Sequence, residues 1–277
     1  MPGPADRPRL TDPRALAAHR ARAGRIGDGS AMFLHEAAFD EIEEKLRDVN
    51  RRFTNPAIVT AHPGLWAGIA SGAVVVPPVE VLDLVPGAHD LVIHAMCLHW
   101  SDDPVGQLIQ CARALRPDGL LLVALPGGET LNELRAALGQ AEIELTGGLS
   151  PRVAPMGELR DMAGLLQRAG LALPVADVAT LRVRYRDIAH LVRDLRAMGE
   201  TSALAQRRRG VPPRGLFARA DAIWREAFPD GDGLAATFET IYLTGWAPSE
   251  DQPRPLRPGS AQMSLADALG RAERDET

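Results

Sequence analysis

The chain has 277 residues, of which 45% are hydrophobic, and its formal net charge is −5 at pH 7. This length and apolar content allow one large α/β domain with an appendage, or two small domains. The negative charge argues against nucleic-acid binding, and no apolar run approaches the roughly 20 residues that cross a bilayer. Two cysteines, Cys97 and Cys111, are too few for a disulfide scaffold, so a reducing, cytoplasmic compartment fits best.

The N-terminal residues 1–30 form an expected arm before the main domain. They contain several arginines, but also acidic residues and no apolar signal core, so we expect an ordinary surface helix over 12–23. A targeting peptide or a partner-docking arm is the alternative. Lys45 is the only lysine among 31 basic residues, which we interpret as a GC-rich bacterial coding bias rather than as a functional feature.

The first half of the main domain begins with an amphipathic helix and two short strands. Residues 33–53 place their apolar side chains on one stripe, which indicates a helix that packs on the edge of the domain. We expect strands over 57–60 and 73–76 and a short helix over 65–70. Pro77 and Pro78 stop the second strand, and residues 79–85 support no assignment.

The most regular stretch is residues 87–128, which predicts a βαβ unit. Residues 90–95 form an apolar strand, and a helix follows from Pro104 with Asp102 or Asp103 as its cap. Arg116-Pro117-Asp118-Gly119 predicts a turn in which the glycine is free to take positive φ. Residues 120–125 are the second buried strand, and the unit is expected to be right-handed.

The remaining residues alternate helices and strands before a proline-rich tail. Thr237 to Trp246 is rich in residues that favour strands and should be the last strand. The main domain therefore spans 31–247, with a helical insertion at about 187–230 and a tail over 248–277. The other expected elements are helices at 129–145, 156–169, 187–198, 201–209 and 214–227, strands at 173–178 and 180–185, and a weak helix at 264–273.

The chain resembles the class I S-adenosylmethionine-dependent methyltransferases. The strings GGETLNELRAAL, GGLSPRVAP, RDLRAMGE, LTGW and RPGSA resemble, more specifically, the branch that contains a mitochondrial complex I assembly factor acting as an arginine hydroxylase. The biotin-pathway methyltransferases of malonyl-acyl carrier protein are more distant. The resemblance implies a truncated Rossmann-like sheet with helices on both faces and a helical subdomain inserted before the last strand.

The resemblance also implies a strand arrangement. Strands 57–60, 90–95 and 120–125 should be parallel and adjacent, with 90–95 in the middle. Strand 237–246 should run antiparallel to strand 120–125 or its neighbour.

The sequence departs from this family where the cofactor should bind. The family follows its first strand with an acidic, glycine-rich run, because the backbone approaches the cofactor closely there. This chain has Thr60-Ala61-His62-Pro63-Gly64-Leu65-Trp66 instead. Only Gly64 remains of the glycines, Pro63 lacks a donor, and His62 and Trp66 add bulk in the same place.

The spacing between the first strand and strand 90–95 supports the same interpretation. Three crossovers and two strands need about 46 residues, whereas residues 61–89 supply 29. At least one β-α unit should therefore be missing, and we infer that it held the adenosine. In the family the second strand ends in a carboxylate that accepts the ribose hydroxyls, whereas here that strand stops at Pro77 and Pro78. Glu80 and Asp83 could replace this carboxylate, so His62, Gly64 and Asp83 are the weak cofactor-binding candidates.

Three nearby residues at a strand end, His94, Cys97 and His99, make a metal site conceivable. Structural sites usually need four ligands, and alternation along an extended segment would separate His94 from the other two. A core histidine beside a buried cysteine fits better, so we predict no metal. His99 and Trp100 fall on the loop where relatives place groups that face the substrate.

The second group of candidates flanks the helix expected at 129–145. Gly127, Gly128 and Glu129 precede it at the carboxyl edge of the sheet, where open α/β folds bind ligands. Arg152 lies in the irregular run after it. A guanidinium can grip a carboxylate with two parallel hydrogen bonds, although Arg152 could equally pair with Glu129 or Glu158.

The resemblance implies an assembly or modification factor for respiratory complex I. With its cofactor loop lost, the protein is expected to be a pseudoenzyme with no cofactor and with a protein partner, a complex I subunit being the candidate. Peripheral membrane association stays open. The alternatives are an active S-adenosylmethionine-dependent methyltransferase with an altered loop, and a relic of the family unconnected with respiration.

Overall fold

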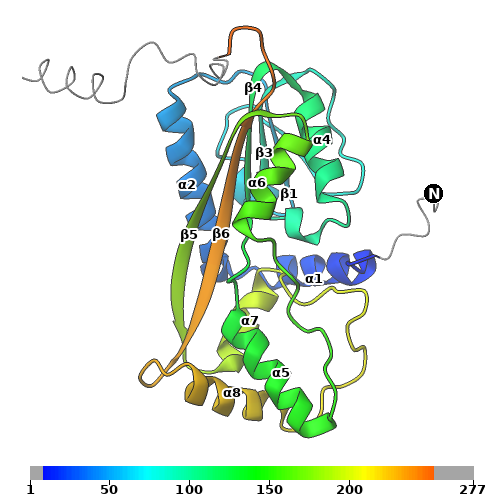
Figure 1. Ribbon diagram of the computed structural model, residues 1–277, viewed down its shortest axis with the longest axis vertical. Coiled ribbons are helices and arrows are strands. Elements are labelled where there is room, and N and C mark those ends of the chain that lie inside the picture. The colour runs from blue at the N-terminus through cyan, green and yellow to red at the C-terminus, as the bar shows by residue number, and fades with distance from the viewer. Residues whose placement is uncertain (1–8, 253–277) are drawn as a thin grey trace, which may run out of the picture.

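A six-stranded sheet forms the centre of the protein, as seen in a computed structural model that describes residues 9–252 (Figure 1). The strand order is β2-β1-β3-β4-β6-β5. The strands are β1 (Pro56–Thr60), β2 (Val74–Val76), β3 (His89–Ala95), β4 (Leu115–Pro126), β5 (Ala172–Tyr185) and β6 (Leu234–Trp246).

The register of the sheet confirms the predicted strand arrangement. β1, β2, β3 and β4 are parallel, with Ile58 beside Ile93 and Ile93 beside Leu122. β6 runs antiparallel to β4, and β5 runs antiparallel to β6. The chain therefore has the mixed α/β, Rossmann-like sheet that its resemblance implied.

Helices cover both faces of the sheet because its central strands carry apolar residues on both sides. On one face lie α2 (Phe33–Val49) and the single turn α3 (Pro63–Trp66), whose Ile42 and Trp66 are fully buried. On the other face lie α4 (Pro104–Ala114) and α6 (Leu159–Arg168), with Leu108 and Leu166 inward. Asp103, not Asp102, caps α4 by accepting from the Gly106 amide.

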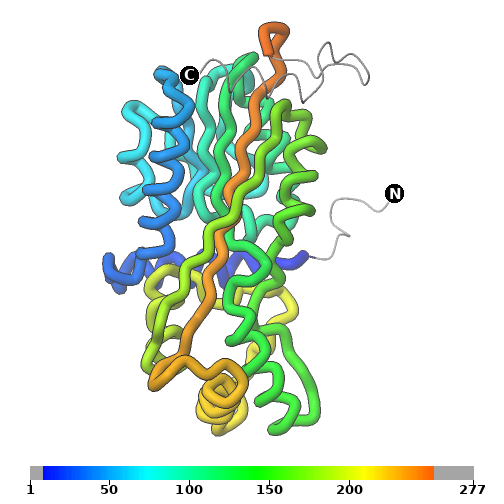
Figure 2. Tube along the Cα trace, turned by 60° about the vertical axis from the view of Figure 1, so that its left-hand side comes forward, coloured from blue at the N-terminus to red at the C-terminus, as the bar shows by residue number. Residues whose placement is uncertain are grey.

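A second, helical part surrounds the far halves of β5 and β6 (Figures 1 and 2). It contains α7 (Ile188–Ala197) and α8 (Leu216–Ala227), which lie between these two strands in the sequence, and also α5 (Asn132–Thr146). Trp224 and Phe238 are buried in its core. The helical insertion predicted at 187–230 is therefore completed by a helix from outside that range.

The helix expected over 12–23 is present in the described part of the N-terminal arm, and it packs against the main domain. Helix α1 (Pro13–Ile26) crosses the waist of the molecule (Figure 1), and Asp12 caps it by accepting from two backbone amides. Its residue Leu16 packs with Trp100 and Leu204. A 3-10 turn over Gly29–Met32 then leads into α2. Within residues 9–252, no helix has the length and apolar character needed to cross a membrane.

The expected helix at 201–209 is wrong. Its backbone instead pairs with the segment before α1, because Asp12 N–H donates to Ala203 O at 2.7 Å and Ala205 N–H donates to Leu10 O at 2.8 Å. Helix α5 also begins later than expected, at Asn132, because Leu131 N–H donates to Thr237 O outside the helix. Helix α6 likewise starts at Leu159, after Gly157 forms a bridge with Gly127.

Three further expectations concern strands, a turn and the tail. The two strand pieces predicted at 173–178 and 180–185 are one strand, because β6 pairs with nearly the whole run. In the turn before the apolar part of β4, Asp118 rather than Gly119 takes positive φ, at 62°. Gly119 is needed for space, since a Cβ there would lie 3.0 Å from Arg116 O. The helix predicted at 264–273 lies outside the described residues.

The connection between β1 and β3 is short. Only α3, of four residues, and β2, of three residues, occupy it, where our residue count for the complete fold requires one more strand and one more crossover. β2 is the edge strand of the sheet on this side.

Candidate functional site

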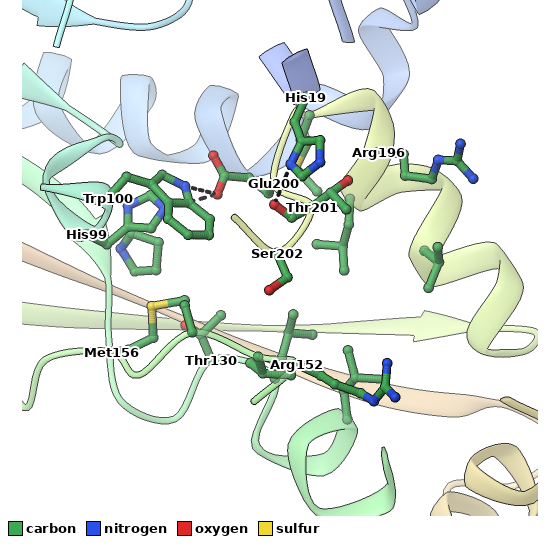
Figure 3. A pocket seen from close by; sticks show the side chains of 18 of the residues that line it. His19, His99, Trp100, Thr130, Arg152, Met156, Arg196, Glu200, Thr201 and Ser202 are labelled. Carbon is green, nitrogen blue, oxygen red and sulfur yellow. Dashed lines mark hydrogen bonds and ion pairs between the residues drawn. The ribbon is translucent and has the colours of Figure 1, made fainter. Parts of the chain in front are cut away.

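A cavity of about 390 Å³ lies at the carboxyl edge of the parallel strands, between the sheet and the helical part (Figure 3). Its walls are mainly apolar side chains of α2, α5, α7 and β6. Open α/β folds bind ligands at this edge, and a cavity of this size is in the range of small-molecule or side-chain sites.

Glu200 forms the polar wall of the cavity together with His99 and Trp100. Its Oε2 accepts from His99 Nε2 at 2.9 Å and from Trp100 Nε1 at 2.7 Å. Burial alone would raise the pKa of this carboxyl, but the electrostatic interaction with His99 and the two hydrogen bonds lower it to about 2. Glu200 is therefore an ionised carboxylate at neutral pH, held by two rings from the 3-10 turn Leu98–Trp100.

Two more polar atoms lie beside this wall. Among residues 9–252, His99 Nδ1 and Ser202 Oγ are buried without a hydrogen-bond partner, and both residues line the cavity. Buried polar groups are nearly always satisfied, so unpaired atoms here mark the end of the cavity where a polar group of a ligand would be accommodated.

Helix α1 and the segment after α7 close the cavity on one side. His19 Nδ1 lies 3.0 Å from Thr201 O, and Asp102 Oδ1 accepts from the amides of Leu10 and Thr11 at 2.9 Å. Arg207 adds an ion pair with Asp12 at 2.9 Å. The sequence placed α1 in a separate arm, whereas the structure makes it part of the site.

Arg152, the predicted contact residue, lines the cavity but is already engaged. Its Nε and Nη2 donate to Glu142 at 3.2 and 2.7 Å. The hydrogen bond from Arg152 is the main cause that lowers the pKa of the buried Glu142 carboxyl. The expected self-pairing of Arg152 therefore occurs, but with Glu142 rather than with Glu129 or Glu158.

The Gly127-Gly128-Glu129 turn lies next to the cavity without lining it. A Cβ on Gly127 would collide with the side chain of Glu239, and one on Gly128 would lie 2.5 Å from Glu158 Oε1. A side chain at either position would therefore displace the glutamate that lies against it. Glu129 accepts from Asn132 Nδ2 at 2.6 Å at the start of α5.

The carboxyl end of β1 is filled by aromatic side chains. The His62 and His35 rings lie 4.5 Å apart, and Trp66 Nε1 donates to His35 Nδ1 at 3.2 Å. Burial lowers the pKa of His35 to about 3 and also lowers that of His62. A Cβ on Gly64 would meet nothing within 4 Å.

The predicted cofactor residues are not brought together around the cavity. None of residues 60–89, all of which the structure describes, lines it. Asp83 and Glu80 are exposed on a segment that runs along α4, where Gln110 donates to Glu80 O and accepts from the Leu82 amide.

His94 and Cys97 are in contact, contrary to the separation that we expected from strand alternation. Cys97 Sγ lies 3.6 Å from His94 Nδ1, because Met96 takes a positive φ of 50° and turns the chain back. Burial lowers the pKa of His94 to about 4, and Gln107 lies 2.8 Å from its Nε2. His99 pairs with Glu200 instead, and no cluster within residues 9–252 could hold a metal ion.

Sequence reasoning missed Glu200, His35 and Ser202. Glu200 ends the string RDLRAMGE that carried part of the resemblance, and it follows Gly199, whose φ is 82°. A carboxylate directly after a helix-terminating glycine is a signal that could have been noticed. His35 and Ser202 have no such signal, because their helical or loop neighbourhoods are ordinary.

Comparison with known proteins identifies a methyltransferase relationship. Residues 66–123 match the family described as "Methyltransferase domain". The arginine-hydroxylase NDUFAF5 of Danio rerio is 36% identical over 200 residues, covering 71% of this chain and 62% of the relative. That of Homo sapiens is 36% identical over 189 residues, covering 68% of this chain and 54% of the relative.

A second group of relatives carries a different name. A malonyl-[acyl-carrier protein] O-methyltransferase of Laribacter hongkongensis is 36% identical over 187 residues, covering 68% of this chain and 61% of the relative. The chain thus spans less than two thirds of these curated relatives. Among solved structures, a protein described as a "putative methyltransferase" from Bacillus halodurans has a TM-score of 0.48 at 13% identity, covering 75% of this chain and 99% of that one.

Proposed function

We propose that this chain, which belongs to the class I S-adenosylmethionine-dependent methyltransferase superfamily, is an assembly or modification factor for respiratory complex I. In this role it binds a protein partner through the cavity and does not turn over S-adenosylmethionine. One observation carries the proposal: the cavity is built from residues 19–35 and 96–238, without any contribution from residues 60–89.

The edge where the superfamily holds its cofactor is unsuited to S-adenosylmethionine. His62 and Trp66 occupy the space after β1 where close backbone approach needs glycines. β2 ends at Pro77 and Pro78, and the nearby carboxylate of Asp83 is exposed beside α4 rather than at the strand end. We propose that the cofactor motif is degraded and that the protein is a pseudoenzyme toward this cofactor.

The cavity chemistry suits an arginine side chain of the partner. The relatives named arginine-hydroxylase NDUFAF5 act, by that name, on arginine. Here Glu200 supplies an ionised carboxylate at the end of a mainly apolar cavity, and a guanidinium pairs with a carboxylate through strong, charge-assisted hydrogen bonds. Leu131, Leu195 and Phe238 would contact the aliphatic stem.

A cell experiment tests the role. The gene is deleted and replaced by variants, and assembled complex I is measured by native electrophoresis. Val192→Trp fills the cavity from α7 and should abolish rescue, whereas the matched variant Val81→Trp, at a side chain 76% exposed away from the cavity, should rescue fully. Normal complex I in the deletion strain would refute the respiratory role, and equal rescue by both variants would refute the cavity as the working site.

Titration calorimetry tests the cofactor. The dissociation constant of S-adenosylmethionine should be millimolar or higher, because the glycine-rich run after the first strand and the carboxylate that would bind the ribose are both missing. A dissociation constant in the low micromolar range would favour an active methyltransferase with an altered loop instead.

A further inference from the structure

Strand β5 is an open edge of the sheet. It is the last strand in the order β2-β1-β3-β4-β6-β5, it has 14 residues, and within residues 9–252 no strand pairs with its outer side (Figures 1 and 2). The other edge strand, β2, has only three residues. An unpaired edge as long as β5 presents a row of backbone donors and acceptors that another strand can join.

The middle of β5 lacks the features that usually prevent strand pairing. Pro174 and the irregular register beside it interrupt one end of the strand, and Arg182 places a charge at the other. Between them, residues 175–181 pair with β6 in a regular register. The one charged residue of this stretch, Asp177, is already paired, because Lys45 Nζ lies 2.8 Å from its Oδ2.

Residues 175–181 carry three exposed apolar side chains. Val175 is 52% exposed, Val178 is 45% exposed and Leu181 is 40% exposed. Because side chains alternate along a strand, Val178 projects from one face of the sheet and the other two project from the opposite face. None of the three lines the cavity. A group of exposed apolar side chains along an unpaired strand is typical of a surface that another chain covers.

The spacing of these three residues is symmetric about Val178. Directly opposite residues of an antiparallel pair project from the same face. When a second copy of β5 is placed by a two-fold axis at Val178, Val178 lies opposite Val178 of the second copy. Val175 then lies opposite Leu181 of the second copy, and this pair occurs twice. Every exposed apolar side chain of the stretch therefore meets an apolar side chain.

The neighbouring registers do not have this property. With the axis at Ala179, Leu181 would lie opposite Asp177. With the axis at Asp177 itself, two carboxylates would lie directly opposite each other, which is unfavourable. The apolar and charge patterns therefore agree on one register, and they agree for a second copy of this strand. A strand of an unrelated protein would not require the pattern to be symmetric about its own centre.

We propose that two copies of this chain associate through β5, antiparallel about a two-fold axis at Val178, and so join their sheets into one. A closed, isologous dimer is the expected assembly when one surface is complementary to itself. A single strand edge is a small interface, so the dissociation constant should be on the order of 10–100 μM. The inference is independent of the proposed function, because its residues lie outside the cavity and its test uses the purified chain alone.

Sedimentation velocity of the full chain, from about 1 to about 300 μM, tests this association. The unmodified chain should change from monomer to dimer over this range. Val178→Asp and Val178→Lys should each weaken dimerisation at least about tenfold, because each places two like charges opposite each other on the axis. The matched control Val81→Asp, at an exposed side chain between β2 and β3, should dimerise like the unmodified chain.

A mixture of the two charged variants tests the position of the axis. Val178→Asp mixed with Val178→Lys should associate at least as tightly as the unmodified chain, because the residues opposite each other now carry opposite charges. Recovery in the mixture excludes a loss that comes only from a disturbed fold. The proposal is wrong if the unmodified chain stays monomeric at every concentration, if Val178→Asp dimerises as well as Val81→Asp, or if the mixture shows no recovery.

Discussion

The two ends of the sheet differ in how completely they are built. On the side of β1 and β2, the connection to β3 contains a single helical turn and a three-residue strand. On the side of β4, β5 and β6, long strands carry a helical part and a cavity. Both ends are nevertheless packed, since Trp66 on one side and Trp224 on the other are fully buried.

This difference shows that the apolar packing of the sheet is kept even where the connection between strands is short. The shortened end keeps the apolar contacts that hold α2 on the sheet, because burial depends only on apolar area and shape. A cofactor site depends instead on backbone approach and on single polar groups, and our proposal is that the short connection no longer supplies them.

Removing a buried tryptophan from each end should have the largest effect. Trp66→Ala and Trp224→Ala should each lower the free energy of unfolding by about 3–5 kcal/mol, as expected for large buried aromatic side chains. Urea unfolding at neutral pH measures both. A cost under about 1 kcal/mol for Trp66→Ala alone would mean that the shortened end is loosely packed.

Breaking the Arg152 ion pair should come next. Arg152→Ala leaves the buried Glu142 carboxylate without its main partner, and should cost about 2–3 kcal/mol, less than for a fully buried pair because Arg152 is 18% exposed and Arg208 lies 3.8 Å from the same carboxylate. Adding Glu142→Gln should restore part of the loss. If the double variant is no more stable than Arg152→Ala, the cost of Arg152→Ala does not come from leaving the Glu142 carboxylate without its partner.

Acid should destabilise the protein through histidines near the shortened end. The pKa of His35 is about 3 and that of His94 is about 4 when folded, below the ordinary value of 6.5. The unfolded chain therefore binds more protons below pH 6.5, and stability is lost as pH falls from 6.5. At pH 5 each histidine should account for at most about 2 kcal/mol.

Urea unfolding at pH 7.5 and pH 5 checks this loss. His94→Gln should reduce the difference in stability between the two pH values, whatever its effect at pH 7.5. Glu200 does not add to the loss between pH 7.5 and pH 5. Its pKa is lowered from 4.5 to about 2, so the stability that it contributes is lost only as the pH falls from about 4.5 to about 2. If His94→Gln shows the same difference in stability between pH 7.5 and pH 5 as the unmodified protein, His94 is not a source of the acid sensitivity.

The fold was predictable where periodicity and strand chemistry agree. The strands at 57–60, 90–95, 120–125 and 237–246 were found because continuous apolar or β-favouring runs are local signals. The helix expected at 201–209 failed because its backbone bonds with Leu10 and Asp12, nearly two hundred residues earlier. No local pattern can report such a competition.

The site was predictable only in part for the same reason. His99, Trp100 and Arg152 were chosen from their positions at strand and helix ends, and all three line the cavity. Their carboxylate partners, Glu200 and Glu142, were not chosen, because each pairing depends on how the helical part folds back over the sheet. Asp83 was chosen only as a carboxylate that follows the second strand, and it lies exposed on the α4 side.

The smallest predicted effect compares the two tryptophan nitrogens. Trp66 Nε1 donates to His35 Nδ1 at 3.2 Å, whereas Trp224 Nε1 is buried without a partner among residues 9–252. Trp66→Phe therefore leaves a buried acceptor unpaired, while Trp224→Phe removes an unpaired donor. Both lose similar volume, so Trp66→Phe should cost about 1 kcal/mol more in urea unfolding at pH 7.5. In a double-mutant cycle with His35→Phe, a coupling near zero between positions 66 and 35 would show that this hydrogen bond does not stabilise the shortened end.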